Sequence, residues 1–402
     1  MARAGPGRPG AAGREAQPTR LVAANVVFFP LATLYAIAVL PLSVLAMLGR
    51  TRAFPALASS TGHAHEMLFG FALAVVVGNQ LGRIPVRRLA LLAVLWLIAR
   101  FTFLWAPQGV AAAAANSAFA ALLATQLAPR LLAAAKKWRN EALPLVLTGI
   151  CVCAVAFQLA RQAGLAAAEH TVLAVAVLLF ALLLLFMGGR IIAPAVAGQF
   201  YRQGGNLDAR VQPRLEGGII VAMAIAIVAS LFPSWRPAAL VAAAAATLSG
   251  VLALVRLFRW RLWALQGRPD LLCLAAGYGW LGLGLLSYGL AVGAGRYQTA
   301  ALHIITVGAL GTLTLNVMAM TWTLKTGHDP SRARLRIAAT VLVGGATLAR
   351  VLAGQGTFDL QLLLLIAATM WSSGFALLLL LLVRHRPGRS PRVPAKASEH
   401  RA

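Results

Sequence analysis

The sequence predicts an all-α polytopic membrane protein, with about twelve transmembrane helices in one bundle. Three observations predict this fold. Of the 402 residues, 60% are hydrophobic and 11% are charged, whereas about a quarter of the residues in soluble domains are charged. The apolar residues fall into runs of about 20, the length that a helix needs to cross the hydrocarbon core of a bilayer. Lysines and arginines separate these runs in an alternating pattern.

The twelve runs are bounded by charged residues or by Pro and Gly clusters. They lie near residues 22–48, 63–82, 88–106, 110–128, 142–161, 170–192, 216–233, 237–257, 270–293, 297–322, 335–354 and 359–384. Because all the helices share one slab of lipid, we expect a single bundle at 21–385. Residues 1–20 have no apolar core of a signal peptide, so we expect a disordered cytoplasmic tail there and a second, basic one at 386–402.

Positive charge sets the predicted orientation. If the runs alternate in direction, the loops on one side, together with both tails, hold most of the 36 lysines and arginines. The loops on the other side hold only Arg50, Arg52, Arg161, Arg236, Arg296 and Arg350. Basic loops stay in the cytoplasm, so both termini are predicted to be cytoplasmic.

The formal net charge of +26 could in principle indicate nucleic-acid binding. The basic residues lie between apolar runs, however, so we interpret them as a topology signal and expect a lipid bilayer, not a nucleic acid, as the partner. No Gly-rich phosphate loop, Ser/His/Asp arrangement or zinc-finger spacing is present. The cysteines Cys151, Cys153 and Cys273 lie inside apolar runs and are interpreted as small buried residues.

Few titratable residues lie inside the runs, and such residues are expensive in lipid and therefore candidates for function. His63, His65 and Glu66 open the second run, and His303 lies within the tenth. The predicted topology brings these histidines to the outer face and places His328 on the opposite side. A transition metal or haem iron needs imidazole nitrogens that converge from different helices, and these two helices can supply them.

Helical spacing divides the residues of the second run. His63 shares a face with Glu66 and Met67, while His65 points away unless the first turn is irregular. The two histidines can therefore serve different centres, or one of them can simply cap the helix. Glu66 could orient an imidazole, bind a metal or carry protons.

Other polar residues have simpler interpretations. His170 fits a polar anchor at the interface, His328 fits a solvated turn, and Arg100 and Arg350 fit side chains that snorkel from helix ends. Carboxylates such as haem propionates are an alternative partner for the two arginines. His65 and His303 are each followed five residues later by a glycine, which is a weak sequence similarity between the two helices.

The run from His63 through His65-Glu66-Met67 to Phe71-Ala72 resembles the second-helix motif of the NnrS family, which are bacterial inner-membrane proteins. Further matches are Gly189-Arg190-Ile191-Ile192 with Pro194, Gly277-Tyr278 with Trp280, and residues 303–318. The chain departs from the family pattern after Gly78-Asn79-Gln80, where it passes directly to the third helix without a longer loop. It departs again at Lys325-Thr326-Gly327-His328, which is similar to a Gly-His element of the family but shifted by about one residue.

The resemblance implies haem and copper as cofactors and a link to nitric oxide metabolism, nitrosative stress and denitrification. It implies His63, His65 and His303 as cofactor ligands, with Glu66, Met67 and His328 as further metal candidates. Nitric oxide and a respiratory electron donor are the implied partners, and the inner membrane is the implied location. No particular reaction is implied.

Two other classes of function stay open at this stage. One is a secondary transporter or metal permease in which Glu66 and the intramembrane histidines form a path. The other is an assembly factor for respiratory complexes.

Overall fold

The computed structural model of the chain describes residues 20–135, 138–296, 298–331 and 334–385. Within these ranges eleven helices are long and apolar enough to cross a membrane. The twelfth expected helix is the continuous helical segment from Ser60 to Gln80, whose polar residues make it less apolar than the other eleven. The expected all-α polytopic bundle is therefore confirmed.

The main helices follow the apolar runs closely. They are α1 (Asn25–Met47), α4 (Val86–Trp105), α5 (Val110–Ala134), α6 (Trp138–Gln162), α7 (Ala166–Arg202), α8 (Pro213–Ala229), α9 (Arg236–Arg259), α10 (Pro269–Gly293), α13 (Arg334–Ala353) and α14 (Leu360–Arg384). Short 3-10 turns are η1 (Pro55–Ala58), η3 (Asp208–Arg210) and η4 (Leu262–Leu265).

Two of the transmembrane segments are wound differently in the middle. The second runs as α2 (Ser60–His65), the π-helix η2 (Glu66–Ala72) and α3 (Leu73–Gln80). The tenth runs as α11 (Thr299–His303), the π-helix η5 (Ile304–Gly311) and α12 (Thr312–Lys325). Both π-turns begin directly after a histidine, and π-turns are frequent at functional sites.

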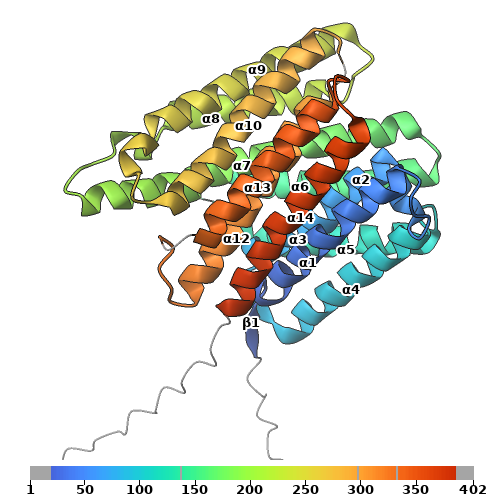
Figure 1. The fold of residues 1–402 in the computed structure, drawn as a ribbon, viewed down its shortest axis with the longest axis horizontal. Coiled ribbons are helices and arrows are strands. Elements are labelled where there is room, and N and C mark those ends of the chain that lie inside the picture. The colour runs from blue at the N-terminus through green and yellow to red at the C-terminus, as the bar shows by residue number, and fades with distance from the viewer. Residues whose placement is uncertain (1–19, 136–137, 297, 332–333, 386–402) are drawn as a thin grey trace, which may run out of the picture.

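The bundle has two edges and a centre (Figure 1). Helices α8, α9 and α10 lie along one edge, α4 and α5 lie along the opposite edge, and α1, α7, α13 and α14 lie between them. Close neighbours are α9 with α10, α13 with α14, α14 with α1, and α5 with α6. The two π-wound segments are both in contact with α7, so they meet in the centre of the bundle.

A short antiparallel pair of strands closes one end. β1 (Leu21–Ala23) pairs with β2 (Arg83–Pro85), which joins the start of the bundle to the link between α3 and α4. β1 and the end of α14 lie at the same end of the bundle (Figure 1), as an even number of crossings requires. We call this end, on which most of the lysines and arginines were predicted to lie, the basic end of the bundle. The pairing was not predicted, because three residues are too few to show an alternating pattern.

Several boundaries differ from expectation. α7 has 37 residues, about 55 Å of helix, and continues ten residues past the expected end at 192. Apolar composition marks the part of a helix that lies in lipid, so it misses a helix that extends beyond it. Residue 20, expected in the tail, is described and its carbonyl accepts a hydrogen bond from the Val86 amide at 3.1 Å. Tail residues 1–19 and 386–402 lie outside the described residues.

Candidate functional site

The second transmembrane segment begins with a cap. The Ser59 hydroxyl accepts a hydrogen bond from the Gly62 amide at 3.1 Å, which is typical of a helix N-cap. Four residues later the winding changes to π, so Glu66 does not share the face of His63. The prediction that His63, Glu66 and Met67 lie on one face is therefore wrong for Glu66. The prediction that His65 faces away from His63 is confirmed.

His63 and Met67 line a cavity of about 340 Å³ between the two π-wound segments. Its walls come from α1, α2, η2, α7, α11, η5, α13 and α14, and most of the side chains are apolar. Its main polar residues are His63, His170, His303 and Arg350. The volume lies in the usual range for small-molecule and cofactor sites. The structure thus brings His63 and His303 together, as the topology predicted.

The hydrogen bonds of His63 leave one ring nitrogen as a free electron-pair donor. Its Nδ1 lies 3.0 Å from the Ser43 hydroxyl oxygen, and that hydroxyl donates to the Leu57 carbonyl at 3.3 Å. Nδ1 must therefore carry the proton that it shares with Ser43, so Nε2 is unprotonated. A partner that fixes the tautomer in this way is typical of metal-binding histidines.

His303 is held in the same manner. Its Nδ1 lies 2.6 Å from the carbonyl oxygen of Thr299, one turn earlier. A carbonyl can only accept, so Nδ1 is the protonated nitrogen and Nε2 is free. Among the described residues, neither His63 nor His303 has a hydrogen-bond partner at Nε2.

The remaining polar residues of the cavity have no such partners. Arg350 is half-buried and, among the described side chains, has neither an ion-pair nor a hydrogen-bond partner. His170 is exposed at the start of α7. Snorkelling therefore does not account fully for Arg350, because its guanidinium borders the cavity and not only the outer solvent.

These donors fit some metals better than others. Within the described ranges, no group of three His, Cys, Asp or Glu residues could hold a metal ion. Two imidazoles with a neighbouring thioether, from Met67, are instead a soft donor set of the kind that suits copper, and imidazole also binds haem iron. The cavity residues therefore fit copper and haem iron.

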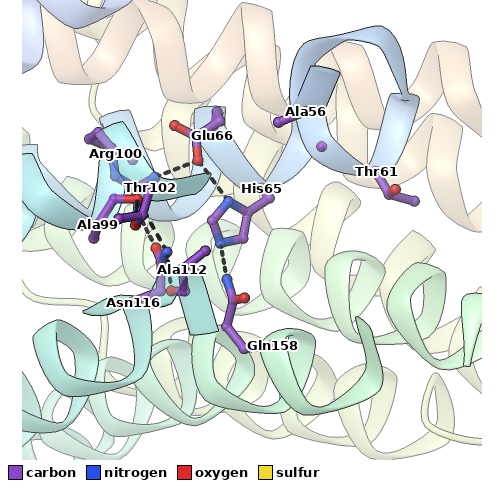
Figure 2. A network of polar contacts seen from close by, with 12 residues as sticks. Ala56, Thr61, His65, Glu66, Ala99, Arg100, Thr102, Ala112, Asn116 and Gln158 are labelled. Atoms are coloured by element: carbon purple, nitrogen blue, oxygen red, sulfur yellow. Dashed lines mark hydrogen bonds and ion pairs between the residues drawn. The ribbon is translucent and has the colours of Figure 1, made fainter. Parts of the chain in front are cut away.

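A separate buried network lies on the other side of the second segment (Figure 2). The Arg100 guanidinium donates to a Glu66 carboxylate oxygen at 2.7 Å and also donates to Asn116. Tyr35 donates to the other Glu66 oxygen. Arg100 and Glu66 are both almost fully buried, so Arg100 does not snorkel, and the expectation that it does is wrong.

His65 belongs to this network and not to the cavity. Its Nδ1 lies 2.8 Å from Glu66 Oε1, and its Nε2 lies 2.8 Å from the amide nitrogen of Gln158. Its ring is stacked on Phe103 with 3.8 Å between ring centroids, and on Phe157. Both nitrogens of His65 are therefore occupied, which leaves none free to bind a metal in this arrangement.

Two glycines explain the close packing around the π-turns. A Cβ at Gly70 would lie 2.7 Å from the Arg100 Nη1 and 2.9 Å from Tyr35. A Cβ at Gly308 would lie 3.0 Å from Trp280. The similarity between the two helices in the sequence therefore corresponds to a shared local structure, a π-turn that contains a closely packed glycine.

His328 lies far from the cavity, at the basic end of the bundle. It is exposed, its Nδ1 lies 3.0 Å from the Thr326 hydroxyl, and its ring meets that of His385 with centroids 3.9 Å apart. His328 and the cavity histidines therefore cannot share one metal ion. The three cysteines are buried and unpaired, as expected.

Sequence reasoning missed three members of the buried network, namely Tyr35, Asn116 and Gln158. Asn116 and Gln158 are amide residues within otherwise largely apolar runs, and a neutral polar residue within a transmembrane helix commonly bonds to a neighbouring helix. That signal could have identified them, whereas Tyr35 is common enough in membrane helices to give none.

Comparison with known proteins supports the resemblance. A comparison with curated proteins returns no match. The family model described as NnrS protein matches residues 26–385, nearly the whole chain. The chain therefore belongs to the NnrS family.

Proposed function

We propose that the protein binds haem and copper in the outer cavity and acts in the response to nitric oxide. The observation that carries the proposal is the pair of imidazoles of His63 and His303, which enter one cavity from two π-wound helices. Each has its Nδ1 engaged and its Nε2 free. Family membership supports the same proposal, because the NnrS resemblance implies these cofactors.

Four residues of the cavity would hold the cofactors. His63 and His303 would be the imidazole ligands, held in one tautomer by Ser43 and by the Thr299 carbonyl. The Met67 thioether, one turn from His63, would add a soft ligand for copper. Arg350 would bind a carboxylate of the cofactor, since its guanidinium has no partner of its own among the described residues.

The mainly apolar walls would admit a small uncharged gas and exclude bulk water. Bound haem iron or copper would supply the coordination position at which nitric oxide binds, with electrons from a respiratory donor. His65 and Glu66 are left out of this ligand set because their polar atoms are already used. They would instead hold the second segment in place beside the cavity.

The transporter alternative has less support. It relied on Glu66 as a coupling residue, but Glu66 does not line the cavity and is paired with Arg100 at 2.7 Å. A charge that is neutralised by a fixed, buried partner is poorly suited to cyclic proton uptake. Nothing in the described structure favours this alternative over cofactor binding.

The test is a cofactor measurement on the purified protein. The chain is expressed with a haem precursor and copper supplied, and its absorption spectrum and metal content are recorded in detergent. We expect a Soret band and copper in the unmodified protein, and a loss of one or both in His63→Ala and in His303→Ala.

The matched control is His328→Ala, at the opposite end of the bundle, which should retain both cofactors. Met67→Leu should lose copper and keep the Soret band. Absence of both cofactors from the unmodified protein would refute the proposal, and their full retention in both cavity variants would refute the ligand assignment.

A further inference from the structure

A second cluster of polar groups lies in the half of the bundle away from the cavity. It consists of Arg256 on α9, Trp260 just after α9, and Tyr278 on α10, with the backbone of α7 beside them. Gly188, which contacts Tyr278, lies eleven residues beyond the cavity residue Val177, about 16 Å along α7. This cluster is therefore separate from the histidine site and does not depend on the function proposed for it.

All three side chains are buried. Arg256 is 4% exposed, and Trp260 and Tyr278 are fully enclosed. They also lie close together: the ring centroids of Trp260 and Tyr278 are 4.9 Å apart, and the Arg256 Cζ lies 5.5 Å from the Trp260 ring.

Each of the three carries a donor without an acceptor. Arg256 Nε and Trp260 Nε1 have no hydrogen-bond partner among the described residues. The Tyr278 hydroxyl lies close enough to the Arg256 guanidinium to accept from it, but its own proton has no acceptor among these residues. The hydrogen bond that the guanidinium donates to a backbone carbonyl is a long one, 3.3 Å from Nη1 to the Leu185 oxygen. Buried polar groups are almost always paired, so three unpaired donors in one place require an explanation.

The charge of Arg256 is also uncompensated. No ion pair of Arg256 is present in the described part of the chain, and the carboxylate of Glu216 is already bound by Arg139 at 2.5 Å. A guanidinium stays protonated in proteins, so it cannot avoid the cost of burial by losing its proton. An anion would supply the missing acceptor and offset this charge at the same time.

Consecutive glycines on α7 make room for this arrangement. A Cβ at Gly188 would overlap the Tyr278 ring, and a Cβ at Gly189 would overlap the Arg256 guanidinium. The guanidinium and the phenol thus lie directly on the α7 backbone, side by side. Gly189 and Tyr278 belong to the sequence matches described above, and the proposed cofactor site uses neither of them.

We propose that Arg256, Trp260 and Tyr278 form a binding site for a small monovalent inorganic anion. Arginine and the indole N–H can only donate hydrogen bonds, so the ligand must be an acceptor. Full enclosure of Trp260 and Tyr278 excludes a lipid phosphate, which would have to enter from the bilayer surface. A halide or a small planar oxyanion matches both the charge of Arg256 and the donors of the three side chains.

The test is equilibrium binding of radiolabelled chloride to the purified full chain in detergent, with ionic strength held constant by gluconate and with nitrate as competitor. We expect saturable binding of one chloride per chain and competition by nitrate. Tyr278→Phe and Trp260→Phe each remove one donor and keep an aromatic ring. Each should weaken the affinity by tenfold or more, because a hydrogen bond to a charged group is lost.

Arg256→Gln should abolish binding. The matched controls are Tyr201→Phe, Trp263→Phe and Arg259→Gln, whose side chains are exposed and whose affinity should equal that of the unmodified protein. Without the anion, Tyr278→Phe should melt no lower than the unmodified protein, since it removes an unpaired donor and keeps the ring. Chloride binding that is absent from the unmodified protein, or unchanged in the two Phe variants, would overturn the proposal and indicate that water alone fills the site.

Discussion

The buried ion pair of Glu66 and Arg100 gives the sharpest test of the structure. Each is nearly inaccessible to solvent, and their charged atoms are 2.7 Å apart. Removal of one member of a buried pair leaves the other charge unpaired, which costs about 3–5 kcal/mol of stability. We therefore expect Arg100→Met and Glu66→Gln each to lower the free energy of unfolding by about that amount.

The double variant should be less damaging than the sum of the two changes. With both charges gone, the losses are mainly two neutral hydrogen bonds, at about 1 kcal/mol each. The amide oxygen of Gln at position 66 can still accept from Tyr35. We thus expect a total loss of about 2–3 kcal/mol, and a coupling energy of at least about 3 kcal/mol.

Equilibrium unfolding by SDS in mixed micelles, followed by circular dichroism, measures all four free energies. The pair Arg139 and Glu216 is the control, because its side chains are 15% and 18% exposed. Because water reaches this pair in part, its cycle of Arg139→Met and Glu216→Gln should give a smaller coupling energy than the Glu66 and Arg100 cycle. Losses in the Glu66 and Arg100 cycle that add to within about 0.5 kcal/mol would refute the reasoning.

Three further outcomes are expected. Gly70→Ala should destabilise the protein by about 1–3 kcal/mol in the same SDS titration, because its Cβ would meet Arg100. The control is Gly344→Ala, which should be neutral or stabilising because a Cβ there meets nothing within 4 Å. Asp359→Ala should lower the free energy of unfolding by about 1 kcal/mol, because the Asp359 carboxylate accepts a hydrogen bond from the Leu362 amide at 3.1 Å at the start of α14. An unchanged free energy of unfolding would contradict this capping role. Green fluorescent protein fused to either terminus should fluoresce in cells, whereas alkaline phosphatase fusions there should be inactive; the reverse would overturn the predicted orientation.

Much of the fold was predictable because lipid imposes a simple length and composition on each helix. The apolar runs located α1, α4 and α14 to within a few residues, and the basic loops implied an even number of crossings. Features that do not depend on apolarity were missed. They include the β1–β2 pairing and the extension of α7 past Pro194.

The candidate site was predicted in part. Helix direction alone was enough to bring His63 and His303 together. The prediction of the helix face on which Glu66 lies was wrong, because helical spacing assumes 3.6 residues per turn and η2 departs from this value. The unpaired donors of Arg256 and Tyr278 could not be foreseen, since their lack of acceptors depends on distances between three helices.

The π-turns also determine which residues face the cavity. A π-turn contains one more residue in each hydrogen-bonded loop than an α-turn does. If the same residues between Glu66 and Ala72 wound as a regular α-helix, the part of the segment before them would rotate by about 100°, the angle of one residue. His63 would then point away from the cavity although every residue type in the motif remained. Loss of the π winding would therefore be more harmful than most changes of a single side chain.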